Sequence, residues 1–509
     1  MPFKPLIRTL LVLGAGFALL VGSTADAGAP RTLDWAFGKK GKVYTNFGRI
    51  DGIADVAVQP NGRIVAVGDS WTLGTGEDHF ALARYRKNGA LDAGFGAGGQ
   101  VTTDFGLPSS AAYAVALQPD AKIVVAGVAG GGSTGADVAL ARYDANGALD
   151  PSFGSGGRVL TDLGGGSFEA AFAMVLQPDG KIVVAGSTRP PGSYDEHPPD
   201  FLVARYTTDG TLDATFGGTG VVTKDFQAGW ADTAYGVALA PGGKIVAAGT
   251  GLPDGASGPG VIDIARYDPD GQPDPGFDGD GALVSAPTDD NGSYGGIVTL
   301  PDGKIVITGA VTLGYMALIR YTATGALDRS FGVARDGVAT TSLGYAVDLV
   351  RQPDGKYVVV GGKATSETNS NFAIARFSRS GILDRLFHGG TATTDLGGWD
   401  VPAAVALQRD GNIVVGGSTG LVLNGFTEAG DFALVRYLGV PSCRVPNVVG
   451  KTMTAAKATI ARANCRLGRV RHRASASVAR GHVVAQRPAP GRTVPNGSAV
   501  NLVVSRDRS

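Results

Sequence analysis

Long apolar runs, cysteines and histidines are scarce in this chain of 509 residues. After an apolar run at residues 10–21, no later stretch approaches the roughly 18 uncharged apolar residues that a membrane-spanning helix needs. The five histidines are scattered and no H-E-x-x-H motif occurs, so no metal site is expected. We also expect no serine nucleophile elbow of the G-x-S-x-G type. The 80 glycines show no Gly-X-Y period, which excludes collagen and favours turn-rich β structure.

The first residues have the pattern of a secretory signal peptide. Lys4 and Arg8 precede the apolar run, and Ala25-Asp26-Ala27 follows it as a small-x-small cleavage pattern. We therefore expect residues 1–27 to be removed, and the mature protein to be secreted, either extracellular or associated with the cell wall. No cysteine lies near the cleavage pattern, so a lipid anchor is not expected.

The net charge of zero conceals two regions of opposite sign. From Cys443 onward there are 11 Arg and 2 Lys against one acidic residue, Asp507, so this segment carries +12. The preceding 442 residues carry 32 basic and 44 acidic groups, or −12. The composition therefore indicates an acidic N-terminal region and a basic C-terminal region that meet near residue 440.

Three markers recur in a fixed order, seven times each, at periods of 54 to 63 residues. The first is an Asp followed three residues later by Phe, as in LDAGFG. The second is a Pro-Asp-Gly turn before an apolar run, as in LQPDGKIVVAGS at residues 176–187. The third is a run such as FALARY that ends in Arg-Tyr or Arg-Phe. Such self-similarity predicts a repeat architecture in which each copy packs against its neighbours.

One copy, residues 92–143, predicts four strands: GQVTTDF, AYAVALQ, IVVAG and DVALARY. In the second, Tyr113, Val115 and Leu117 are expected on one face and the intervening alanines on the other. The third is apolar without alternation, as in a strand covered on both sides. Sheets with two apolar faces must stack on one another, so we predict an all-β, seven-bladed β-propeller over residues 28–440. A linear solenoid is the alternative, but its end copies would be atypical.

The Arg of each fourth strand is followed eight residues later by the Asp of the next turn. This constant offset predicts six ion pairs: Arg84–Asp92, Arg142–Asp150, Arg205–Asp213, Arg266–Asp274, Arg320–Asp328 and Arg376–Asp384. Because every copy has them, a structural role is favoured over a catalytic one. Arg436 and Asp34 have no local partner and should form the seventh pair if the ring is closed, with the strand from Gly41 beside the last copy.

The repeats resemble the delta-60 repeat of exported bacterial proteins over residues 33–437, on the strength of LQPDGKIVVAGS and FALARY. That family is defined by its repeat pattern and implies no activity. Beyond residue 438, VPNVVG, TMTAAKATIARANC, VVAQRPAPG and GSAVNLVVS resemble a PASTA domain, expected at residues 443–507 as a small α+β fold. Some PASTA domains contact peptidoglycan, so the resemblance implies peptidoglycan or another envelope polymer as a partner.

Cys443 and Cys465 are the only cysteines, and in an exported chain we expect them to form a disulfide. A two-ligand metal site is the alternative. We expect Arg466, Arg469, Arg471 and Arg473 to bind the envelope by charge. No cofactor, nucleic-acid partner or membrane span is expected in the mature chain, and we expect a monomer.

The loops on one face of the predicted ring vary between copies, whereas the turns on the other face are nearly constant. Insertions on one face are where binding specificity usually resides. Candidate ligand-binding residues on the variable face are Trp71, Tyr194, His197, Trp230 and Trp399. Residues 268–274, DPDGQPD, offer four oxygen side chains that could hold Ca²⁺, although a plain turn is favoured.

The sequence thus favours an exported, non-enzymatic binding or scaffold protein that combines a propeller with a basic envelope-binding domain. The alternative is a propeller hydrolase or lyase acting on an extracellular polysaccharide. Acids clustered with a His at the mouth of the ring would favour the enzyme, and aromatic side chains alone would favour binding.

Overall fold

The computed structural model describes residues 32–506 except 72–77, 132–134, 193–197, 254–259, 287–292, 311–313, 367–368, 421–429, 440–442, 464 and 495–497. The predicted signal peptide thus lies outside the described residues. The described strands form seven four-stranded antiparallel blades and a small C-terminal domain. Helices in this part of the chain all fall short of the length and apolar character that crossing a bilayer requires.

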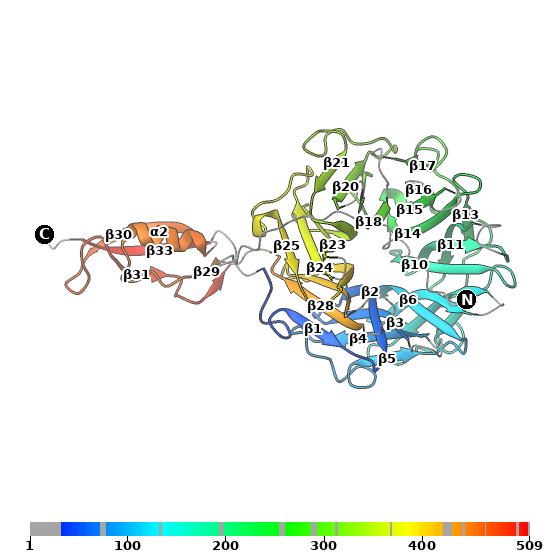
Figure 1. Cartoon of the computed structure of the whole chain (residues 1–509), viewed down its shortest axis with the longest axis horizontal. Coiled ribbons are helices and arrows are strands. Elements are labelled where there is room, and N and C mark those ends of the chain that lie inside the picture. The colour runs from blue at the N-terminus through cyan, green and yellow to red at the C-terminus, as the bar shows by residue number, and fades with distance from the viewer. Residues whose placement is uncertain are drawn as a thin grey trace.

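Blades 1 to 3 follow one another in the chain, each running from its innermost to its outermost strand (Figure 1). Blade 1 contains β2 (Ile50–Val58), β3 (Ile64–Trp71), β4 (Asp78–Tyr85) and β5 (Gln100–Thr103). Blade 2 contains β6 (Ser109–Leu117), β7 (Ile123–Gly130), β8 (Ala136–Tyr143) and β9 (Arg158–Thr161). Blade 3 contains β10 (Phe168–Leu176), β11 (Ile182–Arg189), β12 (Asp200–Tyr206) and β13 (Val221–Lys224).

Blades 4 to 6 repeat the same plan. Blade 4 contains β14 (Ala231–Leu239), the short η2 (Pro241–Gly243), β15 (Ile245–Leu252), β16 (Val261–Tyr267) and β17 (Ala282–Ser285). Blade 5 contains β18 (Ser293–Thr299), β19 (Ile305–Ala310), β20 (Met316–Tyr321) and β21 (Val338–Thr341). Blade 6 contains β22 (Tyr345–Arg351), β23 (Tyr357–Ser366), β24 (Asn369–Phe377), η3 (His388–Gly390) and β25 (Thr391–Thr394).

Blade 7 is assembled from both ends of the repeat region. It contains β26 (Val401–Leu407), β27 (Ile413–Thr419) and β28 (Asp431–Tyr437), and its outermost strand is the N-terminal β1 (Lys42–Thr45). Strands β1 and β28 pair from Lys42 with Val435 to Thr45 with Phe432. The seven-bladed prediction is therefore confirmed, and the linear solenoid is excluded because the first and last blades meet.

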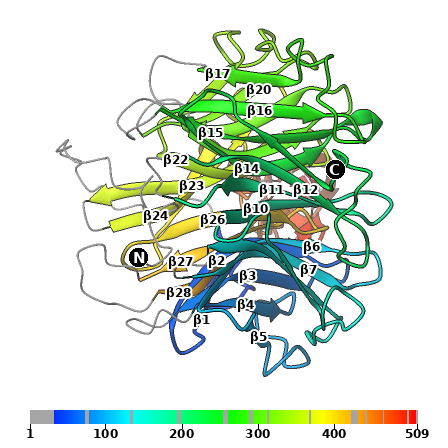
Figure 2. The same cartoon turned by 90° about the vertical axis from the view of Figure 1, so that its right-hand side faces the viewer.

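Neighbouring sheets lie face to face, as the edge-on view in Figure 2 shows. Apolar side chains from each pair of sheets form one core cluster; Val65 and Val67 of blade 1, for example, pack with Ile123 and Val125 of blade 2. All eight residues of β7 are buried, as expected for a strand covered on both sides. Each fully buried Val or Ile stabilises the fold by about 1.5–3 kcal/mol, so the stacking of sheets is the main stabilising term.

The predicted alternation along the innermost strands is wrong at one point. Every innermost strand has a register shift, which in β6 lies between Ala112 and Ala114. A β-bulge adds one residue and so reverses the alternation beyond it. Ala112 therefore packs in the same core cluster as Val115, whereas Ala114 packs on the other side of the sheet.

The C-terminal domain has its own core, with Val448, Ile460, Val500 and Leu502 all nearly inaccessible. It contains β29 (Cys443–Arg444), α2 (Met453–Arg462), β30 (Arg466–Ala474), β31 (Val483–Arg487), β32 (Thr493–Val494) and β33 (Ala499–Arg506). Helix α2 begins after Thr452, whose side-chain oxygen accepts a hydrogen bond from the Ala455 N–H at 3.3 Å. Strand β33 lies between β30 and β31, which leaves β30 as an edge strand.

Candidate functional site

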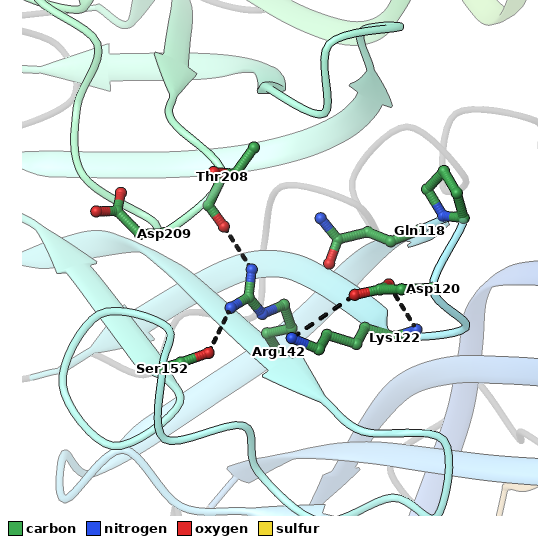
Figure 3. Close-up of a pocket in the computed structure, with 8 residues that line it drawn as sticks. Gln118, Asp120, Lys122, Arg142, Ser152, Thr208 and Asp209 are labelled. Carbon is green, nitrogen blue, oxygen red and sulfur yellow. Dashed lines mark hydrogen bonds and ion pairs between the residues drawn. The ribbon is translucent and has the colours of Figure 1, made fainter.

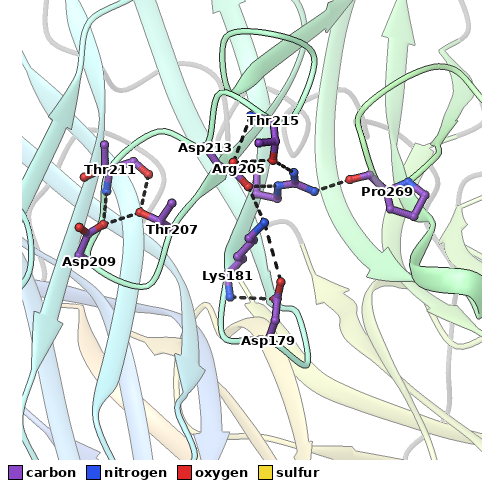
Figure 4. Close-up of polar contacts among 9 residues, drawn as sticks. All are labelled: Asp179, Lys181, Arg205, Thr207, Asp209, Thr211, Asp213, Thr215 and Pro269. Atoms are coloured by element: carbon purple, nitrogen blue, oxygen red, sulfur yellow. Dashed lines mark hydrogen bonds and ion pairs between the residues drawn. The ribbon is translucent and has the colours of Figure 1, made fainter.

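On the face of the constant turns, the arginine near the end of each blade's third strand joins its own blade to the next. In blade 3 (Figure 4), Arg205 Nε donates to Asp213 Oδ2 at 2.8 Å and Nη2 donates to Thr215 Oγ1 at 2.9 Å. Its Nη1 donates to the carbonyl oxygen of Pro269 in blade 4, and its guanidinium lies 4.8 Å from the centre of the Phe216 ring. All three kinds of guanidinium nitrogen are thus used within the protein.

The same contacts recur around the ring. The ion pair is present in all seven copies at 2.5 to 3.0 Å: Arg84–Asp92, Arg142–Asp150, Arg205–Asp213, Arg266–Asp274, Arg320–Asp328, Arg376–Asp384 and Arg436–Asp34. In each copy the guanidinium also lies 4.4 to 4.8 Å from the centre of a phenylalanine ring. Arg436 and Asp34 are 402 residues apart in the sequence, so their contact helps to close the ring.

A second cation reaches most of these aspartates, and the sequence reasoning missed it. Lys122, Lys181, Lys244, Lys304 and Lys356, from the Pro-Asp-Gly turns, lie 2.7 to 3.1 Å from the Asp of their own blade. Burial opposes ionisation of Asp150, but hydrogen bonds from Lys122 and Ser152 outweigh it and hold the pKa of Asp150 well below its usual value. The recurrence of Lys in the turn was the signal that could have predicted this contact.

A shallow hollow of about 430 Å³ lies on this face beside Arg142, lined by Gln118, Lys122, Ser152 and Thr208 among others (Figure 3). Arg142 Nη2 donates to Ser152 Oγ at 3.0 Å, Nε donates to Asp150, and Nη1 donates to the Thr208 carbonyl. Because these donors of Arg142 are already engaged, the hollow is a consequence of the inter-blade network. Gln118 Oε1 is a buried oxygen on its lining that has no hydrogen-bond partner among the described residues.

The candidate aromatic residues of the variable face belong to different blades. Trp71, at the end of β3, is only 7% exposed. Trp230 precedes β14 and Trp399 precedes β26, and both are partly exposed. Tyr194 and His197 lie outside the described residues. Trp71, Trp230 and Trp399 thus belong to blades 1, 4 and 7, and a ligand surface that they share stays a prediction.

Aromatic side chains and carboxyl groups both lie on the innermost strands, which surround the ring axis. Tyr113, Phe172 and Tyr235, from β6, β10 and β14, lie with ring centres 5.1 and 5.3 Å apart. On other innermost strands lie the half-buried Asp55 of β2 and Asp348 of β22. Burial raises the pKa of each of these two carboxyl groups to about 7.

Both carboxyl groups are engaged by the backbone. Asp55 accepts hydrogen bonds from the N–H groups of Val56 and Val115, at 2.7 and 2.8 Å. Asp348 likewise accepts from Leu349 and Val405, at the same two distances. The described sequences of the innermost strands contain no histidine. The two carboxyl groups therefore link neighbouring blades, and no histidine accompanies them on the described innermost strands.

Two sequence motifs can be placed. In residues 268–274, Lys244 Nζ lies 2.8 Å from Asp268 and 2.7 Å from Asp274, so these carboxylates already have a cation and the turn is structural. Contrary to the sequence expectation, G-x-S-x-G does occur, at 131–135 and 416–420. Residues 132–134 lie outside the described residues. Ser418 is a buried residue within β27, so it is not on the exposed strand-to-helix turn of a nucleophile elbow.

The arginines of the C-terminal domain lie on its edge strand. Arg466, Arg469, Arg471 and Arg473 are all exposed on β30. Among the described residues, no acidic group lies within ion-pair distance of any of them; the one acidic residue of this domain, Asp507, is outside the described range. Cys465 is buried at 7% exposure, and the side chain of Cys443 is outside the described residues, so their disulfide stays a prediction.

Comparison with known proteins identifies two domain types. A family described as "Domain of unknown function (DUF5122) beta-propeller" matches residues 59–95, 118–153, 177–216, 241–277, 300–331 and 352–387. The PASTA domain family matches residues 444–506. No curated protein matches the chain. The six DUF5122 segments fall in the region of the delta-60 resemblance, and the structure completes a seventh blade with β1.

Several solved propeller structures are similar at low identity. A catalytically inactive virginiamycin B lyase from Staphylococcus aureus, with quinupristin, is 9% identical, at a TM-score of 0.40, covering 78% of this chain and 99% of that one. An alpha-L-arabinanase from Penicillium chrysogenum is 11% identical, at 0.41, covering 81% and 98%. A gluconolactonase from Xanthomonas campestris is 12% identical, at 0.34, covering 84% and 99%. Similarity at this level does not determine activity. The chain therefore has a DUF5122 beta-propeller repeat region and a C-terminal PASTA domain.

Proposed function

We propose that this protein is an exported, non-enzymatic scaffold whose basic C-terminal domain binds peptidoglycan or another anionic polymer of the cell envelope. The PASTA domain suggests association with the envelope. The observation that carries the proposal is the set of four exposed arginines on β30, which have no acidic partner in the described part of the domain.

The spacing of these arginines suits a repeating anion. Arg469, Arg471 and Arg473 alternate along β30, so their side chains leave the same face of the strand. At a rise of about 3.3 Å per residue, successive guanidinium groups start about 7 Å apart. Guanidinium groups form charge-assisted bonds with carboxylates and phosphates, which are the groups that a wall polymer presents.

Charged side chains on an edge strand also prevent strands of different molecules from pairing. Preventing strand pairing would require only that the arginine side chains be exposed, and it would require no ligand. The two roles differ in a measurable way, because only the binding role predicts retention on an anionic polymer that weakens as salt screens the charges.

The ring supplies the scaffold in this proposal. Its constant face is occupied by the Arg–Asp–Lys network, so the variable loops remain as the surface that differs from blade to blade. A non-enzymatic role is supported by Asp55 and Asp348, whose carboxyl oxygens accept backbone N–H groups.

The test is co-sedimentation with purified peptidoglycan, with and without its covalently attached anionic polymers. Three proteins are compared: residues 28–509, 28–442 and 443–509, the last of which has its own core. We expect 28–509 and 443–509 to sediment with the polymer and 28–442 to stay in solution. Equal sedimentation of 28–442 and 28–509 would contradict the proposal.

A further inference from the structure

Three carboxyl groups converge between blades 3 and 4, at the ends of strands on the face of the variable loops, and a fourth, that of Asp263, lies beside Asp232. Asp200 begins β12, Asp225 follows β13, Asp232 is in β14, and Asp263 is in β16. One oxygen from each of Asp200, Asp225 and Asp232 lies within 4.8 Å of the other two. No lysine or arginine of the described residues lies within ion-pair distance of these groups.

Most oxygens of the buried members of the group receive no hydrogen bond from an N–H or hydroxyl donor of the described residues. Asp232 and Asp263 are both 0% exposed. Asp232 Oδ2 accepts the Phe226 N–H at 2.7 Å, but among the described residues no N–H or hydroxyl donor reaches Asp232 Oδ1 or either oxygen of Asp263, and these two carboxyl groups face each other. Burial, together with the charges of Asp225 and Asp200, raises the pKa of Asp232 to about 6. A buried carboxylate without a donor is costly, so the site requires a positive charge or a proton.

Gly251 provides the space in which two of these carboxyl groups meet. A Cβ atom at Gly251 would lie 2.4 Å from Asp263 Oδ2 and 3.1 Å from Asp232 Oδ1. Any side chain at this position would therefore displace one of the carboxylates. Glycine here keeps both oxygens directed at the same small region beside the strand.

Blade 7 shows how the same position is satisfied without a cation. In blade 7, Asp400 takes the place of Asp232; its Oδ1 accepts from Thr419 Oγ1 at 2.6 Å and its Oδ2 accepts from the Leu396 N–H. The register places Gly251 where blade 7 has Thr419. Blade 4 thus lacks the hydroxyl donor and has gained a carboxyl group.

The additional carboxyl group is Asp263. The registers place it opposite Gly249, a position at which the other six blades have Ala81, Ala139, Leu202, Ala317, Ala373 and Ala433. An acid in an otherwise apolar position, directed at a second buried acid, has no structural counterpart elsewhere in the ring.

A partly similar trio lies between blades 2 and 3, formed by Asp137, Asp162 and Glu169. There Thr188 Oγ1 donates to Glu169 at 3.3 Å, and Leu202 occupies the position of Asp263. Compared with the site between blades 3 and 4, this trio has one more hydrogen-bond donor and one carboxyl group fewer. We therefore propose no cation there.

We propose that Asp200, Asp225, Asp232 and Asp263 bind one Ca²⁺ ion between blades 3 and 4. Ca²⁺ takes six to eight oxygen ligands in flexible geometry, which suits carboxylates from four separate strands and leaves places for water. Mg²⁺ demands near-ideal octahedral geometry at shorter distances and fits this arrangement less well. The bound ion would tie the loop ends of two blades together on the variable face.

The test is calorimetric titration of residues 28–509 with CaCl₂ after removal of metal with EDTA, and a parallel titration with MgCl₂. We expect saturable Ca²⁺ binding with a Kd near the range of about 10⁻⁴–10⁻³ M found for extracellular modules, and weaker Mg²⁺ binding. Two variants should each weaken Ca²⁺ binding at this one site at least tenfold. They are Asp225→Asn, at an exposed position, and Asp263→Ala, which restores the alanine of five other blades.

The matched control is Asp104→Asn. Asp104 lies between blades 1 and 2 at the position equivalent to Asp225, and there His79 and Ser110 replace Asp200 and Asp232. It should bind Ca²⁺ like the wild type. Thermal unfolding adds a sign test: Asp225→Asn should be at least as stable as the wild type in EDTA, but less stable in millimolar Ca²⁺. No saturable Ca²⁺ binding by the wild type, or undiminished binding by Asp225→Asn, would overturn the proposal and indicate that a shared proton satisfies Asp232 and Asp263.

Discussion

Replacing Asp34 with Asn should loosen the strand that closes the ring. Asp34 Oδ2 accepts from Arg436 Nη2 at 2.8 Å, and Asp34 Oδ1 accepts the Ala36 N–H at 3.0 Å. Asparagine keeps an oxygen for Ala36 but removes the charge that pairs with Arg436. Strand β1 and the residues before it are held to blade 7 by four pairs with β28, an isolated bridge from Leu33 to Tyr437, and this ion pair. Backbone hydrogen bonds from Asp34 N–H to the Arg436 carbonyl and from Arg436 N–H to the Gly41 carbonyl add to these contacts.

The size of the effect follows from burial. The Arg436 side chain is 5% exposed and that of Asp34 is 17% exposed. A hydrogen bond to a charged group contributes about 1.5–3 kcal/mol when shielded, and an exposed ion pair contributes about 0–1 kcal/mol. Asp34 lies between these cases, and Arg436 is its one ion-pair partner among the described residues, because Asn412 replaces the turn lysine in blade 7. We expect a loss of about 1.5 kcal/mol, or roughly tenfold in the equilibrium for local opening.

Hydrogen–deuterium exchange followed by mass spectrometry measures this opening. Amides of Lys42–Thr45 should exchange about tenfold faster in Asp34→Asn than in the wild type. Amides of β5, Gln100–Thr103, are the internal control, because β5 has the same place in blade 1 but is joined to β4 through the chain. Unchanged exchange in β1, or an equal acceleration in β5, would refute the view that this pair closes the ring.

Three further outcomes are expected. Arg205→Met should lower the melting temperature more than Lys181→Met. The Arg205 side chain is 5% exposed and reaches the next blade, whereas the Lys181 side chain is 30% exposed and contacts its own blade. Similar decreases in the two variants would contradict the role given to the arginines. Asp55 and Asp348 have raised pKa values in the folded state, so the stability that they contribute is fully present below their unfolded pKa of about 4 and is lost as the pH rises through about 7. The melting temperature should therefore fall from pH 5 to pH 8. It should fall less in the Asp55→Ala/Asp348→Ala double variant. Ile460→Ala should destabilise the C-terminal domain by about 2–5 kcal/mol without changing the unfolding of the ring, as separate calorimetric transitions would show.

The architecture could be predicted because its determinants are local and repeated. The Pro-Asp-Gly turns and the apolar runs after them marked each blade, and the eight-residue spacing from Arg142 to Asp150 brought these residues into contact across one turn. The unmatched Arg436 and Asp34 then required contact between the two ends of the repeat region. This prediction requires only a count of the repeated arginines and aspartates, and the assumption that each repeated arginine pairs with a repeated aspartate.

Contacts between blades were harder to predict from one copy. The donation from Arg205 to the Pro269 carbonyl depends on how two sheets stack, and no spacing within a copy encodes it. The bulge that moves Ala112 onto the face of Val115 depends on register rather than on composition. Asp263 could have been found by aligning the copies, since it replaces alanine or leucine, but its proximity to Asp232 becomes apparent only in the fold.

The most direct test of the account is the binding of two charge-matched variants to purified envelope polymer. The first carries Arg466→Gln, Arg469→Gln, Arg471→Gln and Arg473→Gln on β30. The second removes four exposed charges elsewhere in the domain, with Lys451→Gln, Lys457→Gln, Arg487→Gln and Arg492→Gln. We expect co-sedimentation to be lost in the first variant and largely kept in the second, and wild-type binding to weaken as NaCl is raised from about 0.05 to 0.5 M. Equal binding by the first variant and the wild type, or equal loss in both variants, would contradict the assignment of β30 as the binding surface.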